Sequence, residues 1–515
     1  MKKVQLRSIG FLVIIALVCS FSSSIFATAV SSVYGDLNGD KSVNALDLAL
    51  LKKYLLDNTY TFPAENADKY ADLNGDGTVN VLDYALLKSY LLGKIDSFPA
   101  ESMTKVNIPW DWAGIIGTGQ SLSVGVQGTP IETITQPFNN LTLSLGNINL
   151  PPFDANNTSL KMVPLIEPVH NYAISYPSPY PGNICGETHH SAMANQITSL
   201  VRSVSGKDYI TAHTVVGESG QGISALRKGA TDTGSTGRAY AATLFEVNAI
   251  KRLAAEAGKT YGVGAITITH GESDAGNTLY ENELHTLWSD YNQDIKAITG
   301  QTQKIPLLVV QQHSCGSNGT SASLLAQWRV GVDYPGDIIC IGPNYQNFYA
   351  SDGVHLTTKG YQQLGELYAK VYYEKVVRGK DWQPLQPTGV ERNANVIKVN
   401  FNVPVGPLVW DTSLPEPNQN NYKEWKNGKG FEVSTSSKRI TISSVEISGN
   451  SVIITCDGDV PASGVKVGYA FNAEGTKRDG GTYRWGLLRD SDQFKGYTSG
   501  NVIPNYCVSF EMDVN

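Results

Sequence analysis

The chain has 515 residues, a length that predicts about three domains, and its composition is that of an ordinary globular protein rather than a disordered one. Its net charge is −7, and no block of Lys and Arg occurs beyond the first few residues. This balance argues against a nucleic acid or an anionic membrane as the partner.

The first 29 residues have the pattern of an export signal. Met1-Lys-Lys and Arg7 form a basic start, an apolar run covers 11–19, and Ala27-Thr28-Ala29 supplies the small residues that signal peptidase needs. We therefore interpret 1–29 as a signal peptide and expect a secreted, extracellular protein. No second apolar segment of roughly 18 or more residues follows, which predicts a mature chain without a membrane anchor.

Cysteine usage neither fixes a disulfide framework nor suggests a metal site. Five cysteines lie beyond the predicted signal peptide, and an odd number excludes complete internal pairing. A Cys456–Cys507 bridge and two unpaired buried thiols are equally compatible with the sequence. No cysteine lies in a metal-ligand spacing such as C-x-x-C. The five are Cys185, Cys315, Cys340, Cys456 and Cys507.

An internal repeat fills residues 33–96. The loops 36–47 and 72–83 align residue for residue, and each precedes an apolar helix, predicted over 49–56 and 85–92. Side-chain oxygens at loop positions 1, 3, 5 and 12, with position 7 contributing its carbonyl, are the ligands that Ca²⁺ requires. Simple turns would explain one such loop but not two aligned copies. The predicted ligands are Asp36, Asn38, Asp40, Ser42 and Asp47 for one ion, and Asp72, Asn74, Asp76, Thr78 and Asp83 for the other.

The pair of loops closely resembles a type I dockerin, the module that attaches enzymes to a cellulosome. The resemblance implies two structural calcium ions and a cohesin domain of a scaffold protein as the partner. Lys41 replaces the usual glycine at the sixth loop position, which should weaken the first site. Ala45-Leu46 and Val81-Leu82 stand where dockerins often carry Ser-Thr, so we expect a more apolar contact with cohesin.

After a polar linker, predicted at 97–107, apolar runs alternate with helical stretches, as in a βα domain with a parallel sheet. The run 113–117 predicts a buried strand, and Thr118-Gly-Gln-Ser121 follows it. A serine at this point lies at the carboxyl edge of the sheet, where open α/β sheets bind ligands. Taken alone, the loop favours an ordinary strand-to-helix turn over a catalytic serine.

Three later segments change this interpretation. They are Val215-Val-Gly-Glu-Ser-Gly220, His270-Gly-Glu272-Ser-Asp274 and Ser351-Asp352-Gly-Val-His355. Together with the Gly-Gln-Ser loop, their order and spacing resemble the GDSL/SGNH hydrolase superfamily over 108–378, in particular its acetylxylan-esterase and sialate-O-acetylesterase-like branch. The resemblance implies a three-layer α/β/α catalytic domain with a parallel sheet, which we expect over 108–380.

The resemblance also implies roles for individual residues. Ser121 would be the nucleophile, His355 its general base, and Asp352 the carboxylate that orients the imidazole, because an unassisted hydroxyl is a poor nucleophile. The oxyanion donors would be the backbone N–H groups of Ser121 and Gly220 together with His270, which stands where many members have Asn. Glu272 would support the site, or would only organise its loop. No cofactor is expected for catalysis.

Several other histidines could line a cleft or bind a metal, but we favour a structural role for them. His189 and His190 precede a predicted helix over 191–204, and we favour a structural role for them over one in lining a cleft. The same interpretation applies to Glu167, His170, His213 and His313. A zinc site lacks the H-E-x-x-H or any comparable spacing.

The segment 382–387 is rich in Pro and polar residues and predicts a boundary before a last domain, 388–515. Beyond it, β-branched residues alternate or cluster in 396–401, 439–442, 451–455 and 464–469, which predicts a β-sandwich. We expect Trp410, Tyr483 and Trp485 to be core residues rather than platforms for sugar rings. This domain would bind glycan, shape the cleft or stabilise the enzyme.

Together, these features predict a cellulosomal esterase that removes O-acetyl groups from plant cell-wall polysaccharide, xylan or pectin above all, through an acyl-enzyme. The alternative is a scaffold-docked carbohydrate-binding protein on an inactive esterase fold. The complete set of Ser121, Asp352 and His355 favours the enzyme.

Overall fold

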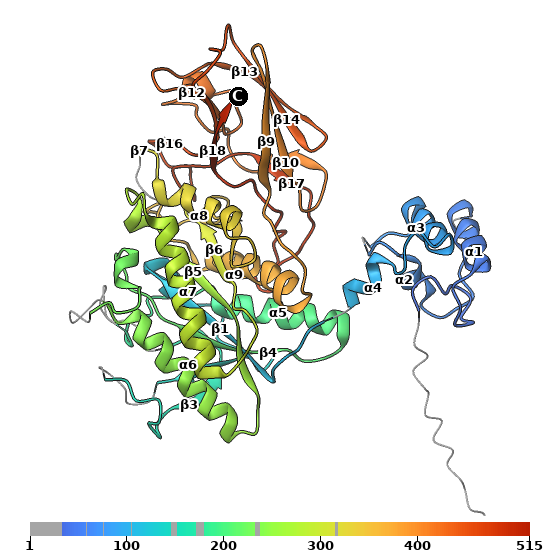
Figure 1. The fold of residues 1–515 in the computed structure, drawn as a ribbon, viewed down its shortest axis with the longest axis horizontal. Coiled ribbons are helices and arrows are strands. Elements are labelled where there is room, and N and C mark those ends of the chain that lie inside the picture. The colour runs from blue at the N-terminus through green and yellow to red at the C-terminus, as the bar shows by residue number, and fades with distance from the viewer. Residues whose placement is uncertain are drawn as a thin grey trace, which may run out of the picture. The chain divides into compact units, whose positions relative to one another are not determined.

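The computed structural model describes residues 33–57, 59–75, 77–104, 106–145, 152–170, 180–231, 237–314 and 318–514 (Figure 1). The chain forms two compact units, Met1–Met103 and Thr104–Asn515. The predicted signal peptide, Asp76 and Cys315 lie outside the described residues. Within those residues, every helix is too short or too polar to cross a membrane.

The first unit is helical and keeps the repeat of its sequence. Its two main helices start at 45 and 81, four residues earlier than predicted. The reason is a capping box in each repeat: Asn44 and Asn80 cap the helix N-termini, and the carboxylates of Asp47 and Asp83 accept from the cap backbones. The helices are α1 (Ala45–Leu56), α2 (Ala67–Ala71), α3 (Val81–Leu91) and α4 (Pro99–Thr104).

Equivalent residues of the two repeats form the core of this unit. Leu37 and Leu73 are fully buried, as are Leu51 and Leu87. Phe98 is 1 % exposed and Ala100 donates its backbone N–H to the Leu73 carbonyl at 3.0 Å. The start of the segment predicted as a linker is therefore packed into the first unit.

A seven-stranded sheet organises the second unit, with order β3-β2-β4-β1-β5-β6-β8. All neighbours pair in parallel except β3, which runs antiparallel to β2 at one edge. This mixed α/β architecture with a largely parallel sheet is the predicted fold class. The strands are β1 (Trp112–Gly119), β2 (Leu141–Ser144), β3 (Lys161–Pro164), β4 (Ile210–Val215), β5 (Tyr261–Thr269), β6 (Leu307–Gln311) and β8 (Ile338–Pro343).

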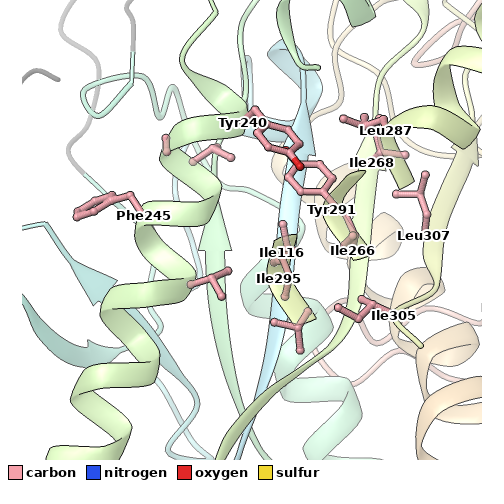
Figure 2. Close-up of a cluster of buried hydrophobic side chains, with 14 of the residues drawn as sticks. Ile116, Tyr240, Phe245, Ile266, Ile268, Leu287, Tyr291, Ile295, Ile305 and Leu307 are labelled. Atoms are coloured by element: carbon pink, nitrogen blue, oxygen red, sulfur yellow. The ribbon is translucent and has the colours of Figure 1, made fainter. Parts of the chain in front are cut away.

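Helices cover both faces of the sheet, because successive strand residues point to opposite sides and both sides are apolar. Ile116 packs with α6, α7 and α8, whereas its neighbour Ile115 packs with α5 and α9. Figure 2 shows the first of these cores, in which Tyr240 and Tyr291 stack at 4.6 Å above Ile116 and Ile266. The helices are α5 (His190–Ser205), α6 (Ala239–Glu256), α7 (Tyr280–Thr299), α8 (Ala322–Asp333) and α9 (Thr358–Tyr372).

The last part of the chain is built from antiparallel strands. A four-stranded sheet, β13-β14-β10-β9, and a three-stranded sheet, β12-β15-β18, share one buried core that includes Val399 and Val467. The segment 439–442 was expected as a strand, but the strand runs from Ile442 to Ser448. The strands are β9 (Gln386–Asn393), β10 (Val396–Asn402), β11 (Leu408–Trp410), β12 (Phe431–Thr435), β13 (Ile442–Ser448), β14 (Ser451–Cys456), β15 (Val465–Tyr469), β16 (Ala473–Glu474), β17 (Leu488–Asp490) and β18 (Phe510–Val514).

The sandwich and the α/β layers share buried contacts within the second unit. Trp328 of α8 and Cys340 of β8 belong to the sandwich core. The Gln311 amide at the end of β6 donates to the Ser509 carbonyl at 2.8 Å and accepts from the Ser509 N–H at 2.7 Å. Cys456 and Cys507 are unpaired, so the bridge left open by the sequence does not form.

Candidate active site and calcium loops

Four segments that follow parallel strands meet at the carboxyl edge of the central sheet. Ser121 comes two residues after β1, Gly220 follows β4, His270 follows β5, and the loop with Asp352 and His355 follows β8. Since β1 lies between β4 and β5, the serine occupies the middle of this edge. This is the position at which open α/β sheets bind their ligands.

The backbone before Ser121 requires glycine. Gly119 has φ +142°, and a Cβ at this position would lie 2.2 Å from the carbonyl oxygen of Thr269. The close approach of β1 and β5 places Ser121 at the start of the short 3-10 helix Ser121–Val124. Ser121 is only 3 % exposed, so its hydroxyl is held rather than free to rotate in solvent.

Ser121, His355 and Asp352 form one continuous hydrogen-bonded chain. The distance from Ser121 Oγ to His355 Nε2 is 2.8 Å, and that from His355 Nδ1 to Asp352 Oδ2 is 2.7 Å. Asp352 Oδ1 also accepts from the backbone N–H groups of Val354 and His355 at 2.9 and 3.0 Å. The three residues proposed for the triad are thus brought together in the order that nucleophilic catalysis requires.

The electrostatics of Asp352 keep its carboxylate charged. Burial acts to raise the pKa of Asp352, but the hydrogen bonds from His355 and from the backbone of Val354 and His355 outweigh it, and the net pKa is lowered. An ionised Asp352 accepts from Nδ1–H, which leaves Nε2 of His355 as the basic nitrogen facing Ser121.

Two backbone donors remain for an oxyanion. In the part of the chain that the structure describes, the backbone N–H groups of Ser121 and Gly220 donate to no protein acceptor. Gly220 adopts φ +74° in an exposed turn after β4, and a Cβ there would meet nothing within 4 Å. Both groups are therefore available to a ligand.

His270, expected as an oxyanion donor, has both ring nitrogens in contact with protein atoms. The side chain of His270 is fully buried, its Nδ1 lies 2.8 Å from the Tyr280 hydroxyl, and its Nε2 lies 3.0 Å from the Gln221 carbonyl. Burial lowers the pKa of His270 although Asp274 and the Gln221 carbonyl act to raise it. A neutral ring has one N–H, and the carbonyl of Gln221 takes it. His270 thus fixes the turn that carries Gly220.

Glu272 lies beside this site without touching the triad. Its Oε1 accepts from the Ser314 hydroxyl at 3.2 Å, while Oε2 is buried and has no partner among the described residues. Burial raises the pKa of Glu272 to about 7. Near neutral pH the carboxyl group therefore exchanges between its neutral and charged forms. We assign it no catalytic step, and its supporting role stays a prediction.

Four further histidines, for which we favoured a structural role, are buried and contact other side chains of the fold. His189 and His190 are buried at the start of α5, where His190 Nδ1 lies 2.9 Å from Nδ1 of His213. Burial lowers the pKa of His189 and of His213 to about 3, so both rings are neutral. His313 joins Gln311 and Ser509 at the junction with the sandwich. Within the described residues, no three His, Cys, Asp or Glu side chains converge on a metal position.

The calcium loops have the donor chemistry that a hard cation needs. Asp36 and Asp47 are buried carboxylates, at 7 and 0 % exposure, and neither forms an ion pair with a cationic side chain of the described residues. Asp36 holds the loop by accepting from Gly39 and Lys41, and the second loop repeats this with Asp72, Gly75 and Gly77. Asp76 is not among the described residues. The three carboxylates of the first loop, all described, do not converge on one point, so the loops fit Ca²⁺ by oxygen type and charge, and the ligand sets stay a prediction.

Lys41 shows why glycine is usual at the sixth loop position. Its φ is +69°, in the left-handed region that costs a side-chain-bearing residue energy, while the equivalent Gly77 adopts φ +87° freely. The first loop therefore carries backbone strain that the second does not, and the weaker first calcium site expected from the sequence stays a prediction.

A hairpin of the sandwich, residues 474–484, adds a contact that the sequence did not reveal. Its Gly480 carbonyl accepts from Tyr349 N–H at 2.9 Å. A Cβ on Gly353, which lies between Asp352 and His355 in the chain, would lie 2.9 Å from Lys477 and 3.4 Å from Tyr483. Trp485 is a core residue at 6 % exposure, as predicted, but Tyr483 lies at this junction. Only the folded chain brings these distant segments together.

Comparisons with known proteins bear chiefly on the first unit. Residues 34–92 match the family model for the dockerin type I domain, so the first unit is a type I dockerin. No curated protein is similar to the chain. Among solved structures, a chain of a type I cohesin–dockerin complex from Clostridium thermocellum is 43 % identical over 13 % of this chain and 97 % of its own, with a TM-score of 0.13.

Two other solved structures are similar to larger parts of the chain. A carbohydrate acetylesterase from Xanthomonas citri is 12 % identical, with 78 % of this chain and 80 % of that one covered and a TM-score of 0.47. A protein from Arabidopsis thaliana is 19 % identical over 51 % of this chain and 98 % of its own, with a TM-score of 0.37.

Proposed function

We propose that the second unit is a serine carbohydrate esterase that hydrolyses O-acetyl groups on plant cell-wall polysaccharide. The observation that carries the proposal is the chain of contacts from Ser121 Oγ through the His355 ring to Asp352, at 2.8 and 2.7 Å. A buried serine with a histidine base and an ionised carboxylate behind it is the arrangement for acyl transfer.

In the first half of the reaction, Ser121 Oγ attacks the acetyl carbonyl carbon and its proton passes to Nε2 of His355. The tetrahedral intermediate then collapses, the bond to the sugar oxygen breaks, and Nε2 returns the proton to that oxygen. The sugar leaves with a free hydroxyl, and the acetyl group remains on Ser121. Asp352 stabilises the imidazolium that forms between the two proton transfers.

In the second half, a water molecule attacks the acetyl-enzyme while His355 takes its proton. Collapse of this intermediate returns the proton to Ser121 and releases acetate. In both halves the negative oxygen forms beside the backbone N–H groups of Ser121 and Gly220, which lack protein acceptors among the described residues. We assign the oxyanion to these two groups and leave His270 as the residue that positions Gly220.

The dockerin supports the choice of substrate and of location. We propose that it binds a cohesin domain of a scaffold protein and so holds the esterase in an extracellular, cellulosome-type complex. Enzymes in such complexes act on plant polysaccharide, which in its acetylated form supplies the ester. Asp36, Asn38, Asp40, Ser42 and Asp47 would hold one Ca²⁺ ion, and Asp72, Asn74, Asp76, Thr78 and Asp83 the other. Each ion would neutralise the carboxylates of its loop.

Acetate release tests the proposal against a non-catalytic binding protein. The full chain is incubated with acetylated xylan, mannan and pectin, and acetate is measured. We expect release from at least one polymer, and we expect Ser121→Ala to reduce the rate by about 10⁴-fold or more, since the nucleophile is lost. Equal release by Ser121→Ala would move the nucleophile elsewhere, and no release from any polymer would favour the binding protein.

A further inference from the structure

The α/β layers and the sandwich enclose a pocket whose volume is about 640 Å³. One wall comes from the segment 346–348 and from Gln363 of α9. The other comes from 413–415, from the hairpin residues 478–480, from 501–504 and from Tyr506. Pockets of roughly 300–1,000 Å³ at the junction of two lobes are the usual size and place for ligand sites.

The pocket lining includes uncharged polar side chains, those of Gln346, Asn347, Gln363, Ser413, Asn501 and Tyr506. Asn347 is 4 % exposed, and its Nδ2 has no hydrogen-bond partner among the described residues. A hydrogen-bond partner among the described residues is also missing for Gln346 Oε1, Gln363 Oε1 and Arg478 Nε. Amide and hydroxyl groups donate and accept hydrogen bonds without carrying a charge, as the hydroxyl groups of sugars do.

The rest of the lining narrows the chemistry of that ligand. Phe348 and Val502 are large apolar side chains left 47 and 48 % exposed, and Leu414 lies with them on the pocket wall. The only charged lining residues are Arg478 and Asp479, whose charges are opposite. A ligand with hydroxyl groups, which both donate and accept, and with apolar C–H faces but no net charge fits this lining.

The pocket wall continues directly into the catalytic loop. The carbonyl of Phe348 accepts from Thr357 N–H at 3.0 Å, and Ala350 N–H donates to the carbonyl of His355 at 2.8 Å. The hairpin that supplies Arg478 also packs against Gly353. A polymer held in the pocket would therefore lie beside the loop that carries the base of the triad.

We infer that this pocket is a sugar-binding subsite for a neutral polysaccharide backbone, an inference that rests on the proposed esterase function and specifies its substrate class. It holds unmodified sugar units of the chain whose acetylated unit lies at Ser121. The sandwich thus contributes one wall of the substrate site. Xylan- and mannan-type backbones fit this site, and a polymer of uronic acids does not.

The test measures binding in the full chain with Ser121→Ala, which prevents hydrolysis. Xylohexaose, mannohexaose and a hexamer of galacturonic acid are titrated by calorimetry. We expect a neutral hexasaccharide to bind, and Phe348→Ala in the same chain to raise its Kd by about tenfold, as expected for loss of a buried aromatic contact. Val332→Ala is the matched control, because Val332 is 48 % exposed on α8 and is outside the pocket lining.

Leu414→Ala probes the opposite wall in case Phe348→Ala alters the catalytic loop, and it should also raise Kd. The inference would be overturned if Phe348→Ala and Leu414→Ala bound the hexasaccharide with the same Kd as the control Val332→Ala. It would also be overturned if only the charged hexamer bound, or if no hexamer bound. The esterase proposal is judged separately by acetate release. Pocket-dependent binding without acetate release would refute the esterase alone, whereas acetate release with pocket-independent binding would refute the subsite alone.

Discussion

His270 is the residue whose role changes most when its surroundings are known. Its two ring nitrogens contact Tyr280 and the Gln221 carbonyl, and its side chain is fully buried. We therefore propose that it acts on the reaction through the turn at Gly220 rather than through a contact with the oxyanion. This distinction has a measurable consequence.

We expect His270→Ala to lower kcat by less than about tenfold, whereas loss of a direct oxyanion donor costs about 10²–10³-fold. The same variant should lose about 1–3 kcal/mol of stability, because the Gln221 carbonyl is left without its donor. Steady-state kinetics and urea unfolding measure the two effects. A fall in kcat of more than about 10²-fold with unchanged stability would restore His270 to the oxyanion site.

Glu167 provides a test of the electrostatics inside the second unit. It is 2 % exposed, its Oε1 accepts from Thr188 and Ser191, and its Oε2 has no partner among the described residues. Burial raises the pKa of Glu167 from 4.5 to about 8, although the hydrogen bonds from Thr188 and Ser191 act to lower it. At a pH between these two pKa values, the Glu167 carboxyl group holds a proton in the folded chain and has lost it in the unfolded chain.

The contribution of Glu167 to the free energy of unfolding should therefore be greatest below about pH 4.5 and should fall as pH rises toward about 8. Glu167→Gln is neutral at every pH and keeps the acceptor oxygen. We expect the variant to be clearly more stable than the natural chain near pH 8 and closely similar to it near pH 4.5, measured by urea unfolding. A difference that does not change with pH would show that Glu167 is charged in the folded state.

How much could be predicted differs among these residues for a physical reason. Ser121, Asp352 and His355 could be identified because each lies in a short contiguous motif, and Asp352 reaches His355 within one turn. The partners of His270 could not, since Gln221 is 49 residues away and meets it only across the sheet edge. The unpaired atoms of Asn347 and Arg478 depend on burial, which has no local sequence signal.

At the scale of elements, apolar periodicity located the main helices and strands well, and local hydrogen bonds set their ends. The helix predicted over 191–204 is α5, His190–Ser205. The two dockerin helices start four residues early because Asn44 and Asn80 cap them, a signal that the apolar pattern alone does not carry. The predicted strand at 439–442 lies mostly outside β13, since cross-strand pairing with β14 begins at Ile442.

The hairpin 474–484 shows what element-level prediction misses. Its residues have ordinary turn composition, and nothing near them in the sequence suggests contact with a catalytic loop more than a hundred positions away. In the folded unit, Gly480 accepts from Tyr349 and Thr482 donates to the His313 carbonyl at 2.9 Å. The role left open for the last domain, to shape the cleft, is the one that these contacts favour.

At the scale of the whole molecule, the two units should respond separately to calcium. We expect a chelator to unfold the dockerin, because the buried carboxylates of its loops repel one another without the ion, and to leave acetate release unchanged. Hydrogen exchange of the full chain should show protection lost in the dockerin helices α1, α2 and α3 and kept in the second unit. Unchanged exchange in these helices would contradict calcium as a structural ion, and loss of acetate release would reveal a metal in catalysis.

The central claim is that Ser121 is a nucleophile activated by His355, and covalent labelling tests it most directly. A phosphonate ester with a good leaving group is incubated with the full chain, and the adduct is located by mass spectrometry of its peptides. We expect one adduct, on Ser121, formed at least about 10²-fold more slowly in His355→Ala. An adduct on another residue, or labelling of Ser121 at the same rate without His355, would contradict it.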